Sequence, residues 1–270
     1  MEHPWRLRLV IPPGSGHPRD RATPATPVAH EPGDVARLAA TARSLEDLDA
    51  RSSVCRACPR LVAWREEVAT ARRASFADQD YWGRPVTGWG PQDARIAAVG
   101  LAPAAHGGNR TGRIFTGDRS GDWLFASLHR VGLAASPTST SAYDGQSLVD
   151  IRITLPVRCA PPANKPTPAE RDTCASWLSA EWRFLQPTVR AVVVLGGYGW
   201  AALWPTLRGA GEAVPAPVPK FAHGAEVTLP SGLTVLGCFH VSQQNTFTGR
   251  LTEPMLDAVF TRAKGLAGVG

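Results

Sequence analysis

Four short apolar runs, each followed by glycine or polar residues, constrain the fold of this chain most. Each run has the length and the β-branched content of a buried strand. The runs occupy residues 95–99, 151–157, 191–195 and 234–239. Helical patterns separate or follow them at residues 118–131, 168–184, 198–207 and 253–266. This alternation predicts a three-layer α/β/α fold with a central, mainly parallel four-stranded sheet.

The segments that leave these four runs are expected to meet. Parallel strands have their carboxyl ends at the same edge of a sheet, and ligands bind in the crevice beyond that edge. Long polar segments follow three of the runs at residues 100–118, 158–164 and 240–245, and Gly196 and Gly197 follow the remaining one. The sequence therefore predicts one cleft shared by all four exits.

The rest of the chain is predicted to be one irregular arm and one domain. Residues 1–33 are rich in proline, glycine and polar residues without periodicity, which indicates an arm. Residues 34–270 are predicted to form a single catalytic domain, with two further helices at 34–50 and 56–73. We find neither a membrane span nor the apolar region of a secretory signal, so a cytoplasmic location is expected.

The charge of the chain favours a polyanionic partner. The formal net charge is +6, and the cations are nearly all arginine, since the only lysines are Lys165, Lys220 and Lys264. The guanidinium fork suits phosphate groups. A modest positive excess is also common in proteins that do not bind nucleic acids, so charge alone does not decide.

Four of the five cysteines form a candidate metal centre. Cys55 and Cys58 have CxxC spacing, and Cys159 and Cys174 could complete a four-thiolate set. Such a set suits an iron–sulfur cluster or zinc, and the spacing does not choose between them. A disulfide is disfavoured in a cytosolic chain, and a chance CxxC at a helix start is the remaining alternative. Cys238 lies inside an apolar run and is expected simply to be buried.

Three segments resemble the motifs of the family 5 uracil-DNA glycosylases. Residues 100–118 (GLAPAAHGGNRTGRIFTGD) resemble the first motif, 158–168 (RCAPPANKPTP) the middle one, and 240–251 (HVSQQNTFTGRL) the last. The resemblance runs from about residue 55 to the C-terminus and includes the four cysteines, which are similar to the family's [4Fe–4S] ligand set. It implies an iron–sulfur cluster rather than zinc.

The resemblance also implies a function. A chain of this family is expected to be a monomeric, monofunctional hydrolase with the uracil-DNA glycosylase fold. It would remove uracil from DNA, and other deaminated bases such as hypoxanthine or xanthine, and leave an abasic site.

The chemistry requires groups that meet two developing charges, because the sugar becomes oxocarbenium-like and the base leaves as an anion. By resemblance, Asp118 is the catalytic carboxylate and His240 donates a hydrogen bond to uracil O2. Asn164 would read the base edge, and Phe115 would stack on the extruded base. From the residues alone, Asp118 could equally be a helix N-cap, Asn164 a turn residue and Phe115 a core residue.

Departures from related sequences bear on specificity. Ala102 stands where better-known uracil glycosylases carry an aspartate, so this position cannot supply the general base of the reaction. Ala104 stands where uracil-specific relatives carry a tyrosine that blocks the thymine methyl group, which predicts a relaxed pocket. His106 is expected to line the same pocket. Val241 replaces the family's usual proline, which should loosen the last motif.

Two groups of residues are expected to contact DNA. The first motif offers close backbone approach and phosphate donors at Gly107, Asn109, Arg110, Thr111 and Arg113. The last motif is expected to enter the minor groove and fill the space left by the extruded base, with Ser242, Gln243, Gln244 and Asn245.

Two other functions remain open at this stage. Val241 is compatible with a nucleic-acid-binding iron–sulfur protein that has lost catalysis. The cysteines are compatible with an iron–sulfur electron carrier, although the sequence has no clear flavin or nicotinamide fingerprint.

Overall fold

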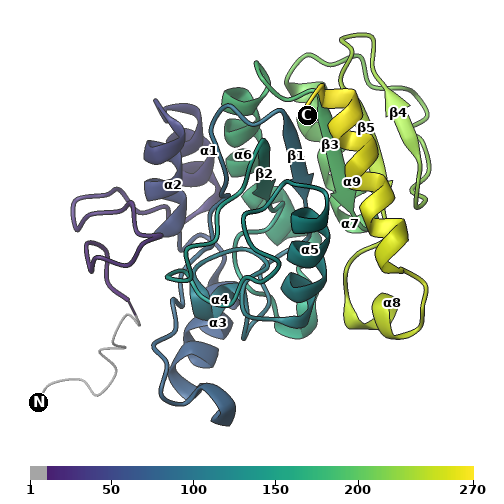
Figure 1. Ribbon diagram of the computed structural model, residues 1–270. Coiled ribbons are helices and arrows are strands. Elements are labelled where there is room, and N and C mark those ends of the chain that lie inside the picture. The colour runs from purple at the N-terminus through teal and green to yellow at the C-terminus, as the bar shows by residue number, and fades with distance from the viewer. Residues whose placement is uncertain (1–10) are drawn as a thin grey trace, which may run out of the picture.

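The central sheet confirms the predicted three-layer α/β/α architecture (Figure 1). The computed structural model describes residues 11–270. Its strands are β1 (Ile96–Val99), β2 (Ile151–Thr154), β3 (Ala191–Leu195), β4 (Glu226–Thr228) and β5 (Thr234–Cys238), in the order β2-β1-β3-β5-β4. Four strands are parallel, as predicted. The fifth, β4, adds an antiparallel edge that the sequence analysis missed, because three mostly exposed residues carry little apolar signal.

Helices cover both faces of this sheet. They are α1 (Pro32–Ala40), α2 (Leu45–Ser53), α3 (Pro59–Ala71), α4 (Gly108–Thr111), α5 (Arg119–Arg130), α6 (Pro168–Leu185), α7 (Gly197–Gly209), α8 (Gln243–Phe247) and α9 (Glu253–Ala267). Short 3-10 turns occupy Ala74–Phe76 and Pro162–Asn164. Within residues 11–270 no helix combines the length and apolarity needed to cross a bilayer.

One predicted helix is wrong in extent. The segment 34–50 forms two helices, α1 and α2, rather than one. The chain leaves the helical conformation after Thr41, and the Ser44 hydroxyl then accepts a hydrogen bond from the Asp47 backbone N–H at 3.1 Å. A serine that caps a new helix competes with continuation of the old one.

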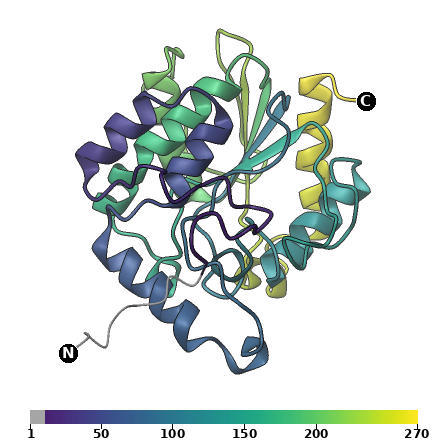
Figure 2. The same cartoon turned by 90° about the vertical axis from the view of Figure 1, so that its left-hand side faces the viewer.

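The two faces of the sheet bury separate cores. Side chains such as Ala98 and Ile153 pack toward α5 and α9, whereas Val99 and Val192 pack toward α1, α6 and α7. Figure 2 shows α1, α2 and α6 on one side of the strands and α9 on the other. Alternate residues of a strand face opposite ways, so a strand buried on both sides is apolar throughout.

The parallel register brings the strand exits together. Val99 pairs with both Thr154 and Val194, and Leu195 pairs with Cys238. The segments that follow β1, β2, β3 and β5 therefore leave from the same edge of the sheet, as the sequence predicted.

The N-terminal segment is irregular but anchored. Residues 11–31 contain neither helix nor strand, and the first ten residues of the predicted arm lie outside the described residues. Asp20 forms an ion pair with Arg84 at 3.0 Å, with both side chains buried, and Arg19 donates to the Gly88 carbonyl at 2.8 Å. These contacts hold the segment against the domain.

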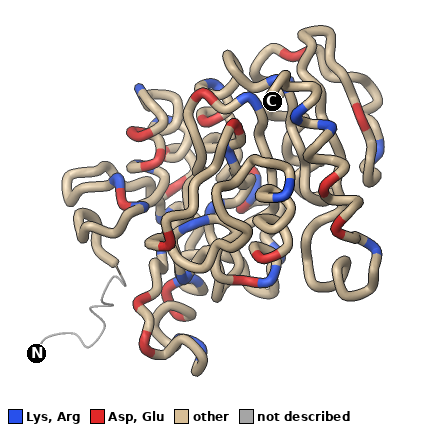
Figure 3. The backbone as a smooth tube through the Cα atoms, in the orientation of Figure 1, with Lys and Arg blue, Asp and Glu red and all other residues tan. Residues whose placement is uncertain are grey.

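Several arginine side chains lie in the interior rather than at the surface. Six are buried among the described residues, namely Arg65, Arg84, Arg110, Arg113, Arg152 and Arg158. In Figure 3 the basic residues are spread along the chain among acidic ones. The net positive charge is therefore a poor guide to where an anionic partner would bind.

The most buried of these ion pairs joins β2 to α6. The wholly buried Glu181 carboxylate accepts hydrogen bonds from Arg152 at 2.7 Å, from Arg158 at 2.6 Å and from the Thr154 hydroxyl at 2.6 Å. Burial alone would raise the pKa of Glu181, but the two guanidinium groups lower it below its ordinary value. The carboxylate is therefore charged in the folded protein.

Replacing Glu181 with glutamine should destabilise the domain strongly. The change keeps the shape but leaves only Asp49, at 3.3 Å from Arg152 and 3.7 Å from Arg158, to balance two buried guanidinium groups. Removing one partner of a buried ion pair costs about 3–5 kcal/mol. Urea denaturation would measure the free energy of unfolding. Glu226→Gln is the matched control, because Glu226 pairs with Arg262 at the surface and should change stability little. Equal losses in both variants would contradict this account.

Candidate active site

A cavity of about 550 Å³ opens at the edge where the parallel strands end. It is lined by residues from all three motif segments. Of the predicted site residues, it brings together Ala102, Ala104, Phe115, Asp118, Asn164, His240, Ser242, Gln243 and Gln244. A carboxylate, an amide and an imidazole that are far apart in the sequence thus surround a single space.

Asp118 has two structural roles at once. It is the N-cap of α5, and its Oδ1 accepts the Gly121 backbone N–H at 2.9 Å. Its Oδ2 lies against Gly107, where an added Cβ would collide with it. Burial raises the pKa of Asp118, and the backbone N–H groups of Gly121 and Ser120 oppose this rise. The N-cap interpretation is correct, and the capping also fixes the carboxylate at the cavity.

His240 follows β5 and is held as a neutral imidazole. Burial lowers its pKa to about 4. Its backbone carbonyl accepts the Asn245 side-chain amide at 2.8 Å, and its ring lies 6.1 Å from the Phe115 ring. Gly196, at the exit of β3, has a φ of +97°, and a Cβ there would come within 3.2 Å of the His240 Cβ. The glycine therefore gives the histidine room.

Phe115 and Asn164 both adopt left-handed backbone conformations, with φ of 51° and 55°. This region is rare for a phenylalanine, whereas asparagine enters it more readily. Phe115 is buried and presents its ring to the cavity, while Asn164 is exposed at the rim. No hydrogen bond from another part of residues 11–270 occupies the Asn164 side-chain amide, so it is available to a ligand.

Comparisons with known proteins show the family of this chain. The family model of the uracil DNA glycosylase superfamily matches residues 87–264. A Mycobacterium bovis protein named type-5 uracil-DNA glycosylase is 59% identical over 263 residues, which are 97% of each chain. A Thermus thermophilus protein of the same name is 49% identical over 217 residues, which cover 80% of this chain and 95% of that one. The chain belongs to the type-5 uracil-DNA glycosylases. The resemblance inferred from the motifs is thus confirmed.

In this type-5 glycosylase, several first-motif residues predicted to contact DNA lie in the interior. Asn109, Arg110, Thr111 and Arg113 are buried. Arg110 donates to the carbonyls of His106 at 2.7 Å and Gly117 at 2.8 Å. The structure therefore does not present these side chains to a phosphate backbone, and it gives Gly107 the different task of accommodating Asp118.

His106 also differs from its prediction, because it does not line the cavity. Its Nδ1 shares a hydrogen bond of 3.0 Å with the Tyr81 hydroxyl. Burial lowers the pKa of His106, and the nearby Arg73 and Arg110 lower it further. Its place is thus behind the first motif, against Tyr81, rather than beside the base.

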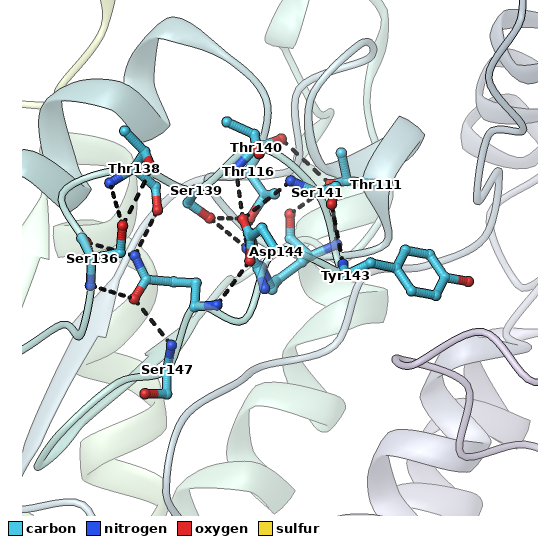
Figure 4. A network of polar contacts seen from close by, with 12 residues as sticks. Thr111, Thr116, Ser136, Thr138, Ser139, Thr140, Ser141, Tyr143, Asp144 and Ser147 are labelled. Carbon is cyan, nitrogen blue, oxygen red and sulfur yellow. Dashed lines mark hydrogen bonds and ion pairs between the residues drawn. The ribbon is translucent and has the colours of Figure 1, made fainter.

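A polar network supports the first motif from behind (Figure 4). Arg113 forms an ion pair with Asp144 at 2.6 Å, and the hydroxyls of Thr116 and Ser139 lie 2.8 Å apart. The Gly117 backbone N–H donates to the Ser139 carbonyl at 2.8 Å. Residues 136–147 therefore brace the segment that carries Phe115 and Asp118.

The last motif supplies the rim of the cavity. Gln243 and Gln244 begin α8 and are exposed, whereas Asn245 turns back to the His240 carbonyl. Val241 is buried in the core between the sheet and α9.

One residue at this rim was missed. Phe247, at the end of α8, is 67% exposed, and its ring lies 6.0 Å from the guanidinium of Arg119, which lines the cavity. A single phenylalanine in a sequence resembles a core residue, so only its exposure distinguishes it.

The four predicted cysteines line a second cavity, together with Arg65 and Trp177. Cys55 and Cys58 both precede α3, Cys159 follows β2 and Cys174 lies on α6. All four are free of disulfides, and burial raises the pKa of Cys58 to about 12. No group of three or more His, Cys, Asp or Glu within residues 11–270 is placed to hold a single metal ion. Cys238 is buried in β5, as predicted.

Replacing Gly107 with alanine should displace the Asp118 carboxylate. A methyl group would collide with Oδ2, and misplacing a reacting group slows catalysis by about tenfold to a hundredfold. The rate of base release from uracil-containing DNA under single-turnover conditions would measure the effect. Gly265→Ala, where the space around the added Cβ is open, is the control. A wild-type rate in Gly107→Ala would show that the contact does not position Asp118.

Proposed function

We propose that this protein removes uracil from DNA by hydrolysing the N-glycosidic bond, and leaves an abasic site. The observation that carries the proposal is the single cavity that joins Asp118, Asn164 and His240. Family membership supports it, because the most similar proteins described above bear this activity in their names. We also propose a monomer as the active unit.

The residues divide the work between the two charges of the transition state. The Asp118 carboxylate faces the cationic sugar and orients the attacking water, while its second oxygen stays bound to the helix. His240 is neutral at physiological pH, so it donates an N–H to the base oxygen where negative charge collects. Neither group needs to move, since capping and burial have already fixed both.

The same cavity supports a broad choice of base. Asn164 offers a donor and an acceptor, and the Phe115 ring offers a stacking surface that does not depend on base identity. Ala102 and Ala104 leave the wall open. We therefore propose hypoxanthine and xanthine as further substrates. No lysine lines this cavity, which supports a monofunctional enzyme, because a lyase needs an amine nucleophile.

The four cysteines are proposed to hold a [4Fe–4S] cluster. Four thiolates are the usual ligand set of such a cluster. All four cysteines line one cavity, which supports a group held by four thiolates. Bound there, the cluster would cross-link α3, the segment after β2, and α6.

The rim is proposed to hold the duplex while the base is extruded. Extrusion leaves a gap in the base stack and costs a few kcal/mol. Phe247 is an exposed aromatic ring beside the cavity, and Gln243 and Gln244 lie one helical turn before it. We propose that these three side chains occupy the gap or contact its edges.

A panel of duplexes with one altered base each would test the activity. Strand breakage after alkali treatment should appear for uracil and, more slowly, for hypoxanthine and xanthine. Asp118→Asn should lower the rate by at least about a hundredfold, because the charge that faces the sugar is lost, while affinity for the duplex changes little. No abasic product from uracil would overturn the proposal. Tight binding without base release would favour an inactive binding protein instead.

The pH dependence of base release should show no histidine titration near its ordinary pKa of 6.5. The His240 pKa is lowered to about 4, so the imidazole is neutral throughout the range from about pH 6 to pH 8. The Asp118 pKa is raised, so the acid limb should lie above pH 3.8, where the carboxylate becomes protonated. Single-turnover rates measured against pH would test both points. A rate that falls as pH rises through 6.5 would mean that a protonated His240 is required.

A further inference from the structure

A buried guanidinium lies among the four cysteines without a close carboxylate of its own. Arg65 on α3 is 1% exposed. Its Nη1 donates to Cys159 Sγ at 2.9 Å and its Nη2 to the Cys55 carbonyl at 3.0 Å, while its Nε has no partner among the described residues. The nearest carboxylate, Glu66, is 3.9 Å away, and Arg56 binds both of its oxygens.

A buried cation needs a compensating negative charge, because it has lost its hydration. Thiols do not supply that charge, whereas four thiolates around a cluster do. The contact between Arg65 Nη1 and Cys159 Sγ places the cation directly on one of the proposed ligands.

The backbone of the same residue reaches the active site. Asn109 on α4 is wholly buried, and its side-chain amide donates to the Arg65 carbonyl at 3.1 Å. Two residues earlier in the chain, Gly107 lies against the Asp118 carboxylate. The side chain of Arg65 therefore lines the cavity of the four cysteines. Its backbone carbonyl contacts Asn109 in the catalytic segment, residues 107–118, which carries Asp118.

We propose that Arg65 balances the charge of the cluster and, through Asn109, positions the segment that carries Asp118. This inference rests on the cluster proposed above. Arg65 and Asn109 are positioning residues, since neither lines the catalytic cavity. The buried Asn109 thus has a role in place of the DNA contact that the sequence predicted for it.

Variants at Arg65 test the charge role, and a variant at Asn109 tests the positioning role. Arg65→Gln should shift the reduction potential of the cluster to more negative values, since reduction adds an electron whose charge the guanidinium stabilises. Arg65→Lys keeps the charge and should recover much of the shift. Voltammetry on the purified full chain would measure it. Arg262→Gln, which removes a surface cation on α9, is the control and should leave the potential unchanged.

Asn109→Leu removes the amide and keeps the approximate volume. It should leave iron content, cluster absorbance and potential at wild-type values, while the single-turnover rate of base release falls about tenfold or more through misplacement of the catalytic segment. If Arg65→Gln fails to fold, Asn109→Leu still tests the positioning role. Arg65→Lys then tests the charge role, and its reduction potential should stay close to that of the wild type.

Several outcomes would overturn the inference. They are an unchanged potential in Arg65→Gln, an Arg65→Lys potential far from that of wild type, and a wild-type rate in Asn109→Leu. Purified protein without iron or cluster absorbance would refute both the cluster and this inference. Uracil release by such iron-free protein would leave the proposed activity standing, so the two failures are distinguishable.

Discussion

In-register pairing of parallel strands is the constraint on which the rest of this structure depends. Because β1, β3 and β5 end level with one another, a carboxylate after the first and an imidazole after the last come within reach of one ligand. β3, which lies between them, supplies no side chain to the cavity. Gly196 at its end leaves room for the His240 side chain. A slip of one residue would turn every buried strand side chain to the opposite core, so the packing of both cores protects the alignment of the site.

The interior is held by charge as well as by apolar packing. Glu181 joins the edge strand β2 to α6 through Arg152. Arg84 anchors the N-terminal segment through Asp20, and Arg113 braces the segment that carries Asp118 through Asp144. Removing one member of such a buried ion pair destabilises the fold, because the other charge is left buried without a partner. Part of the arginine content of this chain thus serves its internal architecture.

The sequence was sufficient for the four parallel strands, for a cleft beyond three of their ends and for most of the cavity lining, because those features leave local patterns. A continuous apolar run indicates a strand that is buried on both faces. The long motifs indicate which segments follow the strands and line the cleft. It was not sufficient for Arg110, Arg113 and Asn109, since a cationic or amide side chain has the same appearance whether it meets a phosphate or a buried carbonyl. Nor was it sufficient for β4 and Phe247, whose pairing and exposure depend entirely on distant parts of the chain.

In the segment 107–118, one side chain has both a structural role and a proposed functional role. Asp118 is both a helix cap and a cavity residue, because a carboxylate has two oxygens and the cap uses one. The segment before it is held from one side by α3 through Asn109 and from another by Ser139. As the proposed catalytic carboxylate, Asp118 would need no reorganisation when charge develops on the sugar, which is the condition under which electrostatic stabilisation is most effective. In the proposed mechanism, the buried polar residues of the first motif therefore contribute by holding this carboxylate in place.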